Sequence, residues 1–385
     1  MRRDSGLAVC GSVDLVLTEP WKGWAAARPA SQVLHLDSGA AGRSSLATLD
    51  AVAAHARREA TVGAYVALRD AQPTLGALRA DVAELLGQPT DGVAFVESGT
   101  AGLEALLRAW PLPPDASVGV VAPEWGPNLA SFAAHGLQVV ELPHDGTGRV
   151  DLDALAAALA DNPPTVVHLT QVTSHRGLVQ PVAAALAVCR AADVPLWVDA
   201  AQALGHVDTA QGVDAVYSTS RKWLNGPRGV GLLAIAERWW DALRVAHRPM
   251  EDSSLPLRHV ESHEAHIAGR IGLAQAVREY VELGPAAVTA RLDEVGRLTR
   301  EVLADTPGWE VAGSTGSAIT ALRPLAGQDV AAVREYLLAE HAILTTGGSL
   351  ARAPRDGAGA LLRVSPHVDA TPDSLARLRS ALPAR

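Results

Sequence analysis

The stretch Tyr217-Ser-Thr-Ser-Arg-Lys-Trp-Leu-Asn-Gly-Pro-Arg-Gly-Val-Gly231 joins the end of an apolar run to a reactive side chain and a glycine- and proline-containing turn. The residues between its two ends separate the apolar run 213–217 from a second apolar run at 230–236, which predicts two strands joined by a loop. Lys222 lies on that loop. Of the 33 basic residues only two are lysines, Lys22 and Lys222, and the others are arginines.

A lysine that persists in so arginine-rich a chain indicates chemistry that a guanidinium cannot perform. A lysine amine can lose its proton and attack a carbonyl carbon to form an imine, whereas arginine stays protonated. We therefore interpret Lys222 as the candidate nucleophile, with an ordinary solvated lysine as the alternative. Lys22 falls in the segment 18–29, for which we expect an irregular arm, and it lacks a strand-loop-strand context.

The overall composition narrows the class of protein. A chain of 385 residues that is 48% hydrophobic can bury a large core and is long enough for two domains. The net charge of -9 argues against nucleic acid or an anionic membrane as the partner. Two cysteines, Cys10 and Cys189, provide neither a disulfide framework nor metal-ligand spacing, so we expect no metal. No run is apolar enough for a membrane span and no signal peptide is recognised, so we expect a cytoplasmic globular protein.

Apolar runs alternate with helical patterns through the middle of the chain. Continuous apolar strands linked by helices predict a mainly parallel sheet that is covered by helices on both faces. In such sheets ligands bind beyond the carboxyl ends of the strands, where Glu124-Trp125, Gln171, Asp199 to Gln202 and Thr219 to Lys222 fall. The expected strands are 118–122, 138–142, 165–170, 195–199 and 215–219, and the expected helices between them are 129–135, 152–160 and 182–192.

The segment before this alternation contains a candidate phosphate site. A strand at 34–42 with a glycine-containing turn and helices at 45–60 and 73–86 are expected first. The turn Ser98-Gly-Thr-Ala101 then follows an apolar run and opens an amphipathic helix. Free amide groups and the helix dipole make such a turn suitable for a phosphate, although a serine before a helix is more often an ordinary N-cap.

The pattern changes after Glu261, where helices at 271–283 and 291–304 precede strands and further helices. Thr371 followed by Pro372 predicts the start of the last helix. We expect a large domain at 32–260, and a smaller α+β domain formed by 261–385 together with an N-terminal arm at 1–31.

Four segments together resemble the class V aminotransferase and cysteine desulfurase group of pyridoxal phosphate enzymes. They are the turn at Ser98, Trp197-Val-Asp-Ala-Ala-Gln202, the lysine segment and Leu362-Arg-Val-Ser-Pro-His367, and they occur in the family's order. The resemblance covers nearly the whole chain. It implies fold type I, an α/β architecture with a mainly parallel seven-stranded sheet in the large domain and a smaller α+β domain.

The resemblance also implies roles for individual residues. Lys222 would bind pyridoxal phosphate covalently, Asp199 would pair with the pyridine nitrogen, and Arg363 would hold the substrate carboxylate. The alternative, purely structural roles are a helix cap for Asp199 and a salt-bridge partner for Arg363. Gln202 would contact the ring hydroxyl and Trp125 would stack on the ring. Gln171 stands at a position where members of this family commonly have asparagine. The phosphate would be held by Thr100, Ala101, Thr219 and Arg221. Gly39 and Ala40 would lie at the substrate. Tyr65 is a candidate for contacting, through its aromatic ring, the trimethylammonium group of the expected substrate.

Two further expectations concern the subunit and the reaction. Gly269-Arg270-Ile271 is taken as the turn by which a neighbouring subunit reaches the phosphate, which implies a homodimer with Arg270 acting in trans.

A desulfurase needs a cysteine on a small-domain loop, and the matching segment 344–354 has none. The pattern is most similar to the carbon–sulfur lyases of ergothioneine biosynthesis, which implies hercynylcysteine sulfoxide as substrate and ergothioneine, pyruvate and ammonia as products. The alternatives are a cysteine desulfurase-like enzyme, another aminotransferase or epimerase of this group acting on a small amino acid, and a non-catalytic descendant of the fold.

Overall fold

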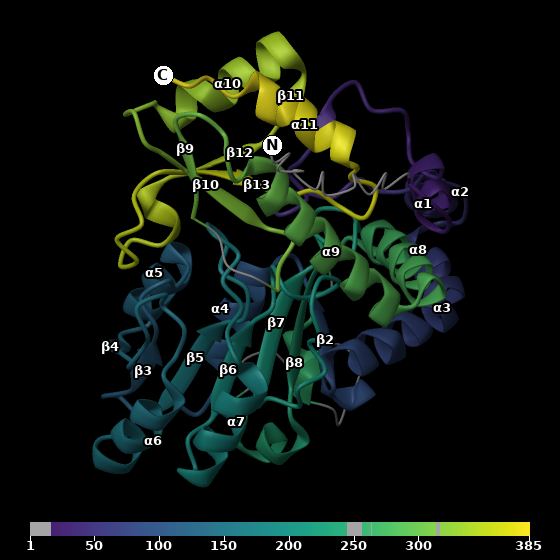
Figure 1. The fold of residues 1–385 in the computed structure, drawn as a ribbon. Helices are drawn as coiled ribbons and strands as arrows, with labels where there is room; N and C mark the ends of the chain where they lie inside the picture. The colour runs from purple at the N-terminus through teal and green to yellow at the C-terminus, as the bar shows by residue number, and fades with distance from the viewer. Residues whose placement is uncertain (1–16, 245–255, 263, 313–315) are drawn as a thin grey trace, which may run out of the picture.

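The computed structural model describes residues 17–244, 256–262, 264–312 and 316–385. A large sheet with its helices forms one part of the molecule, and a smaller sheet with three helices forms the other (Figure 1). The lysine segment lies where the two parts meet.

The large sheet has seven strands in the order β2-β8-β7-β6-β5-β3-β4. Neighbouring strands from β7 to β4 run parallel, whereas β8 is antiparallel to both β2 and β7. The expected mainly parallel seven-stranded sheet is therefore confirmed. The strands are β2 (Val93–Val96), β3 (Ser117–Val120), β4 (Gln138–Glu141), β5 (Val166–Thr170), β6 (Leu196–Asp199), β7 (Ala215–Thr219) and β8 (Gly231–Ile235).

Both faces of this sheet are buried, because successive residues of its strands enter two different clusters. In β6, Leu196 and Val198 pack with α3, α6 and α7, while Trp197 packs on the opposite face with α4 and α5. This burial explains why the inner strands are apolar at most positions rather than at alternate ones, whereas the edge strand β4 is largely exposed. The helices are α3 (Ala64–Leu86), α4 (Gly99–Ala109), α5 (Gly126–Ala134), α6 (Leu152–Asp161) and α7 (Val182–Ala191).

The smaller part contains an antiparallel sheet of order β12-β13-β10-β9 with its own apolar cluster. Thr371 caps its last helix in a capping box with Pro372 in the first turn, as predicted. The elements are β9 (Trp309–Val311), β10 (Thr320–Pro324), β12 (Thr346–Gly348), β13 (Leu361–Val364), α9 (Pro285–Leu303), α10 (Val330–His341) and α11 (Pro372–Ala381). A two-stranded parallel pair, β1 (Leu34–His35) with β11 (Ile343–Leu344), links the N-terminal segment to this part.

Three local expectations were wrong. Segment 18–29 contains a helix, α1 (Trp21–Ala26), whose Trp24 is buried. Helix α3 begins at Ala64 rather than 73 and keeps Pro73 inside it, because packing against α2 (Leu46–Val62) and α8 (Ile267–Leu283) outweighs the proline's preference for a helix start. Gly269-Arg270-Ile271 is not a turn but lies within α8.

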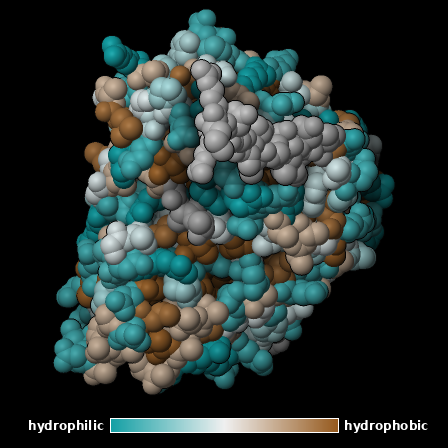
Figure 2. All heavy atoms as spheres, in the orientation of Figure 1, coloured by the Kyte–Doolittle hydropathy of each residue, from teal (hydrophilic) through white to brown (hydrophobic). Residues whose placement is uncertain are grey.

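Hydrophilic and hydrophobic residues are interspersed over the face shown in Figure 2. This mixture is usual for a folded protein surface, where much of the exposed area is still apolar. Within the described residues, no helix combines the length and apolarity that crossing a bilayer would require.

Candidate active site

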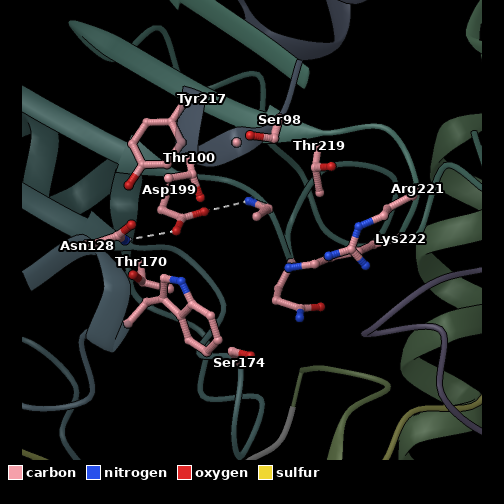
Figure 3. A pocket seen from close by; sticks show the side chains of 14 residues that line it. Ser98, Thr100, Asn128, Thr170, Ser174, Asp199, Tyr217, Thr219, Arg221 and Lys222 are labelled. Atoms are coloured by element: carbon pink, nitrogen blue, oxygen red, sulfur yellow. Dashed lines mark hydrogen bonds between the residues drawn. The ribbon is translucent and has the colours of Figure 1, made fainter. Parts of the chain in front are cut away.

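A cavity opens at the carboxyl ends of β5, β6 and β7, where the sequence predicts ligand binding. It encloses about 650 Å³ when the open solvent at its mouth is included. Figure 3 shows Lys222 and Asp199 directed into this space from different walls. The lining residues are Ser98, Gly99, Thr100, Trp125, Asn128, Thr170, Ser174, Asp199, Ala201, Gln202, Tyr217, Thr219, Arg221 and Lys222.

A tight turn between β7 and β8 positions Lys222. The amide of Asn225 donates to the carbonyl of Lys222, and Asn225 adopts a positive φ of 57° that closes the turn. Gly42 packs directly against this turn and donates its amide to the Arg221 carbonyl. A β-carbon at position 42 would overlap the Lys222 carbonyl and the Asn225 side chain, so the approach requires glycine.

The surroundings favour the neutral form of the Lys222 amine. Burial lowers the pKa of Lys222 from 10.5 to about 7, opposed by Asp199 and assisted by the positive charges of nearby arginines, Arg363 first. About half of the amines are therefore neutral at pH 7, against about 1 in 3,000 for a pKa of 10.5. A neutral amine can attack a carbonyl carbon or accept a proton, which is the state that imine chemistry requires.

Asp199 stands at the end of β6 and is fixed by two donors. Its Oδ1 accepts from the Ala201 amide at 2.8 Å, and its Oδ2 accepts from Nδ2 of Asn128 at 3.0 Å. The same Asn128 nitrogen donates to Glu124 Oε1 at 2.8 Å. One amide group therefore bridges two buried carboxylates, which reduces the cost of keeping both of them ionised.

The bridge continues into a buried network beneath the cavity. Glu124 Oε2 lies 3.0 Å from His168 Nδ1, and His168 Nε2 lies 3.0 Å from the Tyr217 hydroxyl. Burial alone would raise the pKa of Glu124, but His168 and the hydrogen bonds from Asn128 and Thr170 outweigh it, so this pKa falls below its usual value. Burial and the charges of Asp199 and Glu124 raise the pKa of Tyr217. The network thus presents a fixed anion, Asp199, to the cavity.

Two neighbours hold the Gln202 side chain on another wall. Its Nε2 donates to the Gly39 carbonyl at 2.7 Å, and its Oε1 accepts from the indole nitrogen of Trp223 at 3.0 Å. Beneath Trp223, His206 accepts from the Ala318 amide, and burial lowers the pKa of His206 to about 4, so this ring is neutral. One amide hydrogen of Gln202 remains for a ligand.

The phosphate end of the cavity lies at the N-terminus of α4. Ser98 caps the helix and its Oγ accepts from the Ala101 amide at 3.0 Å, so the predicted role of that amide at a phosphate is already taken by the cap. Thr100, Thr219 and the Arg221 side chain remain on the cavity wall. Burial, followed by the charges of Arg228 and Arg363, lowers the pKa of Arg221. A dianionic phosphate would relieve that repulsion.

Arg363 is completely buried beside the cavity. Its guanidinium donates to Asp37 Oδ1 and to the Ser174 carbonyl, both at 2.9 Å, while its Nε has no partner among the described residues. Gly39 packs against this guanidinium. The predicted clamp is therefore next to the cavity and is held by an ion pair with Asp37.

The structure does not bring every predicted residue to the cavity. Gln171 turns away and donates to the Asp208 carbonyl at 2.6 Å. Tyr65 lies on α3 and is 86% exposed. Arg270 pairs with Glu261 at 2.7 Å and donates to the Phe95 carbonyl within its own chain. Gly39 is buried and Ala40 is half-buried, and neither lines the cavity. The roles predicted for these five residues stay predictions.

Sequence reasoning missed Asn128, Thr170, Ser174 and Tyr217 as lining residues. The available signals were weak: Asn128 follows Glu124 by four residues, and Thr170 and Ser174 follow the end of a strand. Within the described part of the chain, no group of three or more histidines, cysteines and acidic residues could hold a metal ion. Cys189 is buried in α7 away from the cavity, burial raises its pKa to about 12, and Cys10 lies outside the described residues.

The cavity matches the chemistry of pyridoxal phosphate group by group. The neutral Lys222 amine would suit an aldehyde, the Asp199 carboxylate a protonated ring nitrogen, and the α4 N-terminus with Arg221 a phosphate. Trp125 supplies an aromatic face on the cavity wall. The side chains present therefore fit this cofactor.

Solved structures with other sequences share this fold. A cysteine desulfurase of Escherichia coli superposes with a TM-score of 0.82 at 22% identity, covering 94% of this chain and 97% of that one. A cystine C–S lyase in complex with its reaction product, cysteine persulfide, gives a TM-score of 0.81 at 18% identity, covering 91% and 97%.

Sequence comparisons are more specific. A protein of Mycobacterium tuberculosis (strain CDC 1551 / Oshkosh) that is named probable hercynylcysteine sulfoxide lyase is 47% identical over 364 residues, which are 93% of this chain and 92% of that protein. An isopenicillin N epimerase of Streptomyces clavuligerus is 26% identical over 347 residues, 82% of this chain and 86% of that protein. The sequence model of the aminotransferase class-V family matches residues 34–378. The chain therefore belongs to the class V aminotransferase family of pyridoxal phosphate enzymes.

Proposed function

We propose that this chain, a pyridoxal phosphate-dependent carbon–sulfur lyase, cleaves hercynylcysteine sulfoxide to ergothioneine, pyruvate and ammonia. The main support is the Lys222 amine, half neutral at pH 7, in one cavity with Asp199 and without a thiol on the described walls. The substrate is suggested by the 47% identical relative, whose name refers to that sulfoxide.

Each group of the substrate has a matching side chain in this proposal. The cofactor, when bound, supplies an aldehyde for the substrate amine and a ring that withdraws electrons from the substrate's α-carbon. The Asp199 carboxylate keeps a proton on the ring nitrogen, and the network through Asn128 keeps that carboxylate in place. The Arg363 guanidinium holds the α-carboxylate, and the Lys222 amine accepts the α-proton.

Among the described residues no thiol lines the cavity, so in this proposal sulfur leaves without attack by a cysteine. As Lys222 takes the α-proton, the bond between the β-carbon and sulfur breaks, its electron pair stays on sulfur, and a carbon–carbon double bond forms. A sulfenate is a better leaving group than a thiolate, so no cysteine has to attack the sulfur. Hydrolysis of the remaining three-carbon fragment gives pyruvate and ammonia, and a thiol reductant in solution must convert the sulfenic acid to ergothioneine.

We also propose that the active enzyme is a cytoplasmic homodimer. A largely apolar groove of about 840 Å³, open solvent included, runs along α2 beside Arg221, and Leu46, Leu49 and Tyr65 are exposed on α2 and α3. A second subunit covering this face would complete the phosphate end of the cavity. Sedimentation velocity of the cofactor-loaded protein tests the proposal, and a monomer that releases pyruvate would contradict it.

A coupled pyruvate assay tests the reaction. Cysteine, cystathionine and hercynylcysteine sulfoxide are compared as substrates of the wild type and of Lys222→Ala. We expect sulfoxide-dependent pyruvate release and a visible absorption band of the bound cofactor, both lost in the variant. Conversion of an amino acid without pyruvate release would instead indicate an aminotransferase or epimerase, and a colourless, inactive wild type would indicate a non-catalytic protein.

A further inference from the structure

Arg352 is a cation at the cavity that the proposed reaction does not use. It lies on the loop between β12 and β13, in the segment where a desulfurase would carry its cysteine. Its guanidinium carbon lies 5.6 Å from the centre of the Trp125 ring, and its Nη1 lies 3.4 Å from the Ser174 hydroxyl. Both of these residues line the cavity, so Arg352 stands at its wall on the small-domain side.

The loop that carries Arg352 is anchored on both sides. The Ala351 carbonyl packs so closely on Gly126, at the start of α5, that a β-carbon on Gly126 would overlap it. Four residues after Arg352, Asp356 forms an ion pair with Arg176 and a hydrogen bond with His175. The loop that carries Arg352 is therefore anchored by contacts that do not involve the Arg352 side chain.

Arg352 lacks a counter-ion. Within the described part of the chain, no carboxylate lies at ion-pair distance from Arg352, and the nearby Asp37 is already bound by Arg363. Arg352 and Arg363 converge on the same Ser174 hydroxyl. Burial, followed by the charge of Arg363, lowers the pKa of Arg352 to about 10. Only one of these two neighbouring guanidiniums has a carboxylate partner, so an anionic ligand would balance the charge of the other.

The other anionic groups of the proposed cofactor and substrate already have an arginine partner, which indicates the group that Arg352 would bind. The cofactor phosphate is assigned to Arg221 and the α-carboxylate of the amino acid to Arg363. We propose that Arg352 binds a further carboxylate that the substrate carries beyond its sulfur atom, so that the enzyme selects sulfur amino acids with two carboxylates. This inference rests on the proposed function, because the histidine-derived half of hercynylcysteine sulfoxide carries such a carboxylate.

A pair of small sulfoxides isolates this contact. S-carboxymethylcysteine sulfoxide has the second carboxylate, whereas S-methylcysteine sulfoxide has the same amino acid and sulfoxide without it. Pyruvate release by the cofactor-loaded enzyme is measured with both compounds and with hercynylcysteine sulfoxide. The variants are Arg352→Gln, Arg352→Lys and, as a matched control from the same loop, the exposed Arg355→Gln.

We expect Arg352→Gln to raise KM for the two carboxylate-bearing substrates about 10- to 100-fold, the range of a charge-assisted hydrogen bond, with a smaller effect on kcat. KM for S-methylcysteine sulfoxide should stay within about twofold, Arg352→Lys should restore part of the loss, and Arg355→Gln should match the wild type. Equal losses with all three substrates would overturn the inference, because Arg352 would then act on the shared amino acid or sulfoxide. An unchanged preference would overturn it as well.

A binding measurement gives a readout that does not depend on turnover. Calorimetric titration of the holoenzyme with ergothioneine and with 2-mercaptoimidazole, which lacks the carboxylate, should show weaker binding in Arg352→Gln for ergothioneine alone. Parallel losses for both ligands would contradict the inference. If the wild type released no pyruvate from any sulfoxide, the proposed function would fail, whereas pyruvate release with an unchanged Arg352→Gln preference would remove only this inference.

Discussion

Replacing Lys222 with methionine should stabilise the cofactor-free protein at neutral pH. Burial lowers the pKa of Lys222 from 10.5 to about 7, with further lowering by the surrounding arginines. The unfolded chain keeps the amine protonated at neutral pH, whereas the folded protein holds about half of it neutral. This difference opposes folding, and methionine keeps most of the apolar stem while removing the titrating group.

The size of the effect follows from the pKa. The difference between 10.5 and about 7 corresponds to about 5 kcal/mol at about 1.36 kcal/mol per pH unit. Because Lys222 keeps some exposed surface in an open cavity, solvent screening should reduce this to about 2–3 kcal/mol. The folded pKa lies below the unfolded one, so the penalty is complete below about pH 7, shrinks as the pH rises, and vanishes above 10.5.

The assay is urea unfolding of the cofactor-free wild type, Lys222→Met and Lys22→Met between about pH 6 and pH 9.5. Lys22 is the other lysine of the chain and is exposed on α1, so its replacement should change the free energy of unfolding by less than about 0.5 kcal/mol. The stabilisation in Lys222→Met should decrease steadily toward the alkaline end. A variant no more stable than the wild type at pH 7, or a gain independent of pH, would refute the reasoning.

Three further predictions concern the cavity walls. Asn128→Ala removes the donor shared by two buried carboxylates and should weaken cofactor binding about 10-fold or more in a spectroscopic titration; unchanged affinity would contradict the bridging role. Gly42→Ala should cost about 3 kcal/mol in urea unfolding, because its β-carbon overlaps the turn of Lys222, while Gly146→Ala, in open space, should cost little. Arg363→Lys keeps the charge but loses the paired N–H donors of the guanidinium, so KM in the pyruvate assay should rise about 10-fold. An unchanged KM would exclude a role for Arg363 in binding the substrate carboxylate.

The sequence predicts the sheet and its ligand-binding edge because both depend on short-range patterns. Apolar runs of strand length separated by helices require a parallel sheet with two covered faces. Asp199 and Lys222 meet because they follow adjacent parallel strands, β6 and β7, at the same edge. Their spacing along the chain therefore translates directly into proximity in the fold.

Other parts of the site depend on tertiary packing that local patterns do not reveal. Asn128 reaches Asp199 only because α5 docks over the end of β5 and brings Glu124 with it. Gln171 follows the same strand yet turns to the Asp208 carbonyl, since a nearby loop offers an acceptor. Arg270 was expected in a turn, but α8 begins three residues earlier and directs it to Glu261. In each case a partner far along the chain determines the orientation of the side chain.

The distribution of charge around the cavity links cofactor binding to proton transfer. Four cationic side chains, Lys222, Arg221, Arg352 and Arg363, face two carboxylates, Asp37 and Asp199. Burial and this positive surplus lower the pKa of the lysine amine to about 7 before anything binds. A phosphate and the carboxylates of a substrate would offset the arginines, which raises the pKa of the same amine once it has been released. Lys222 would then retain a proton taken from the substrate, so the anions that the arginines recruit also strengthen the base.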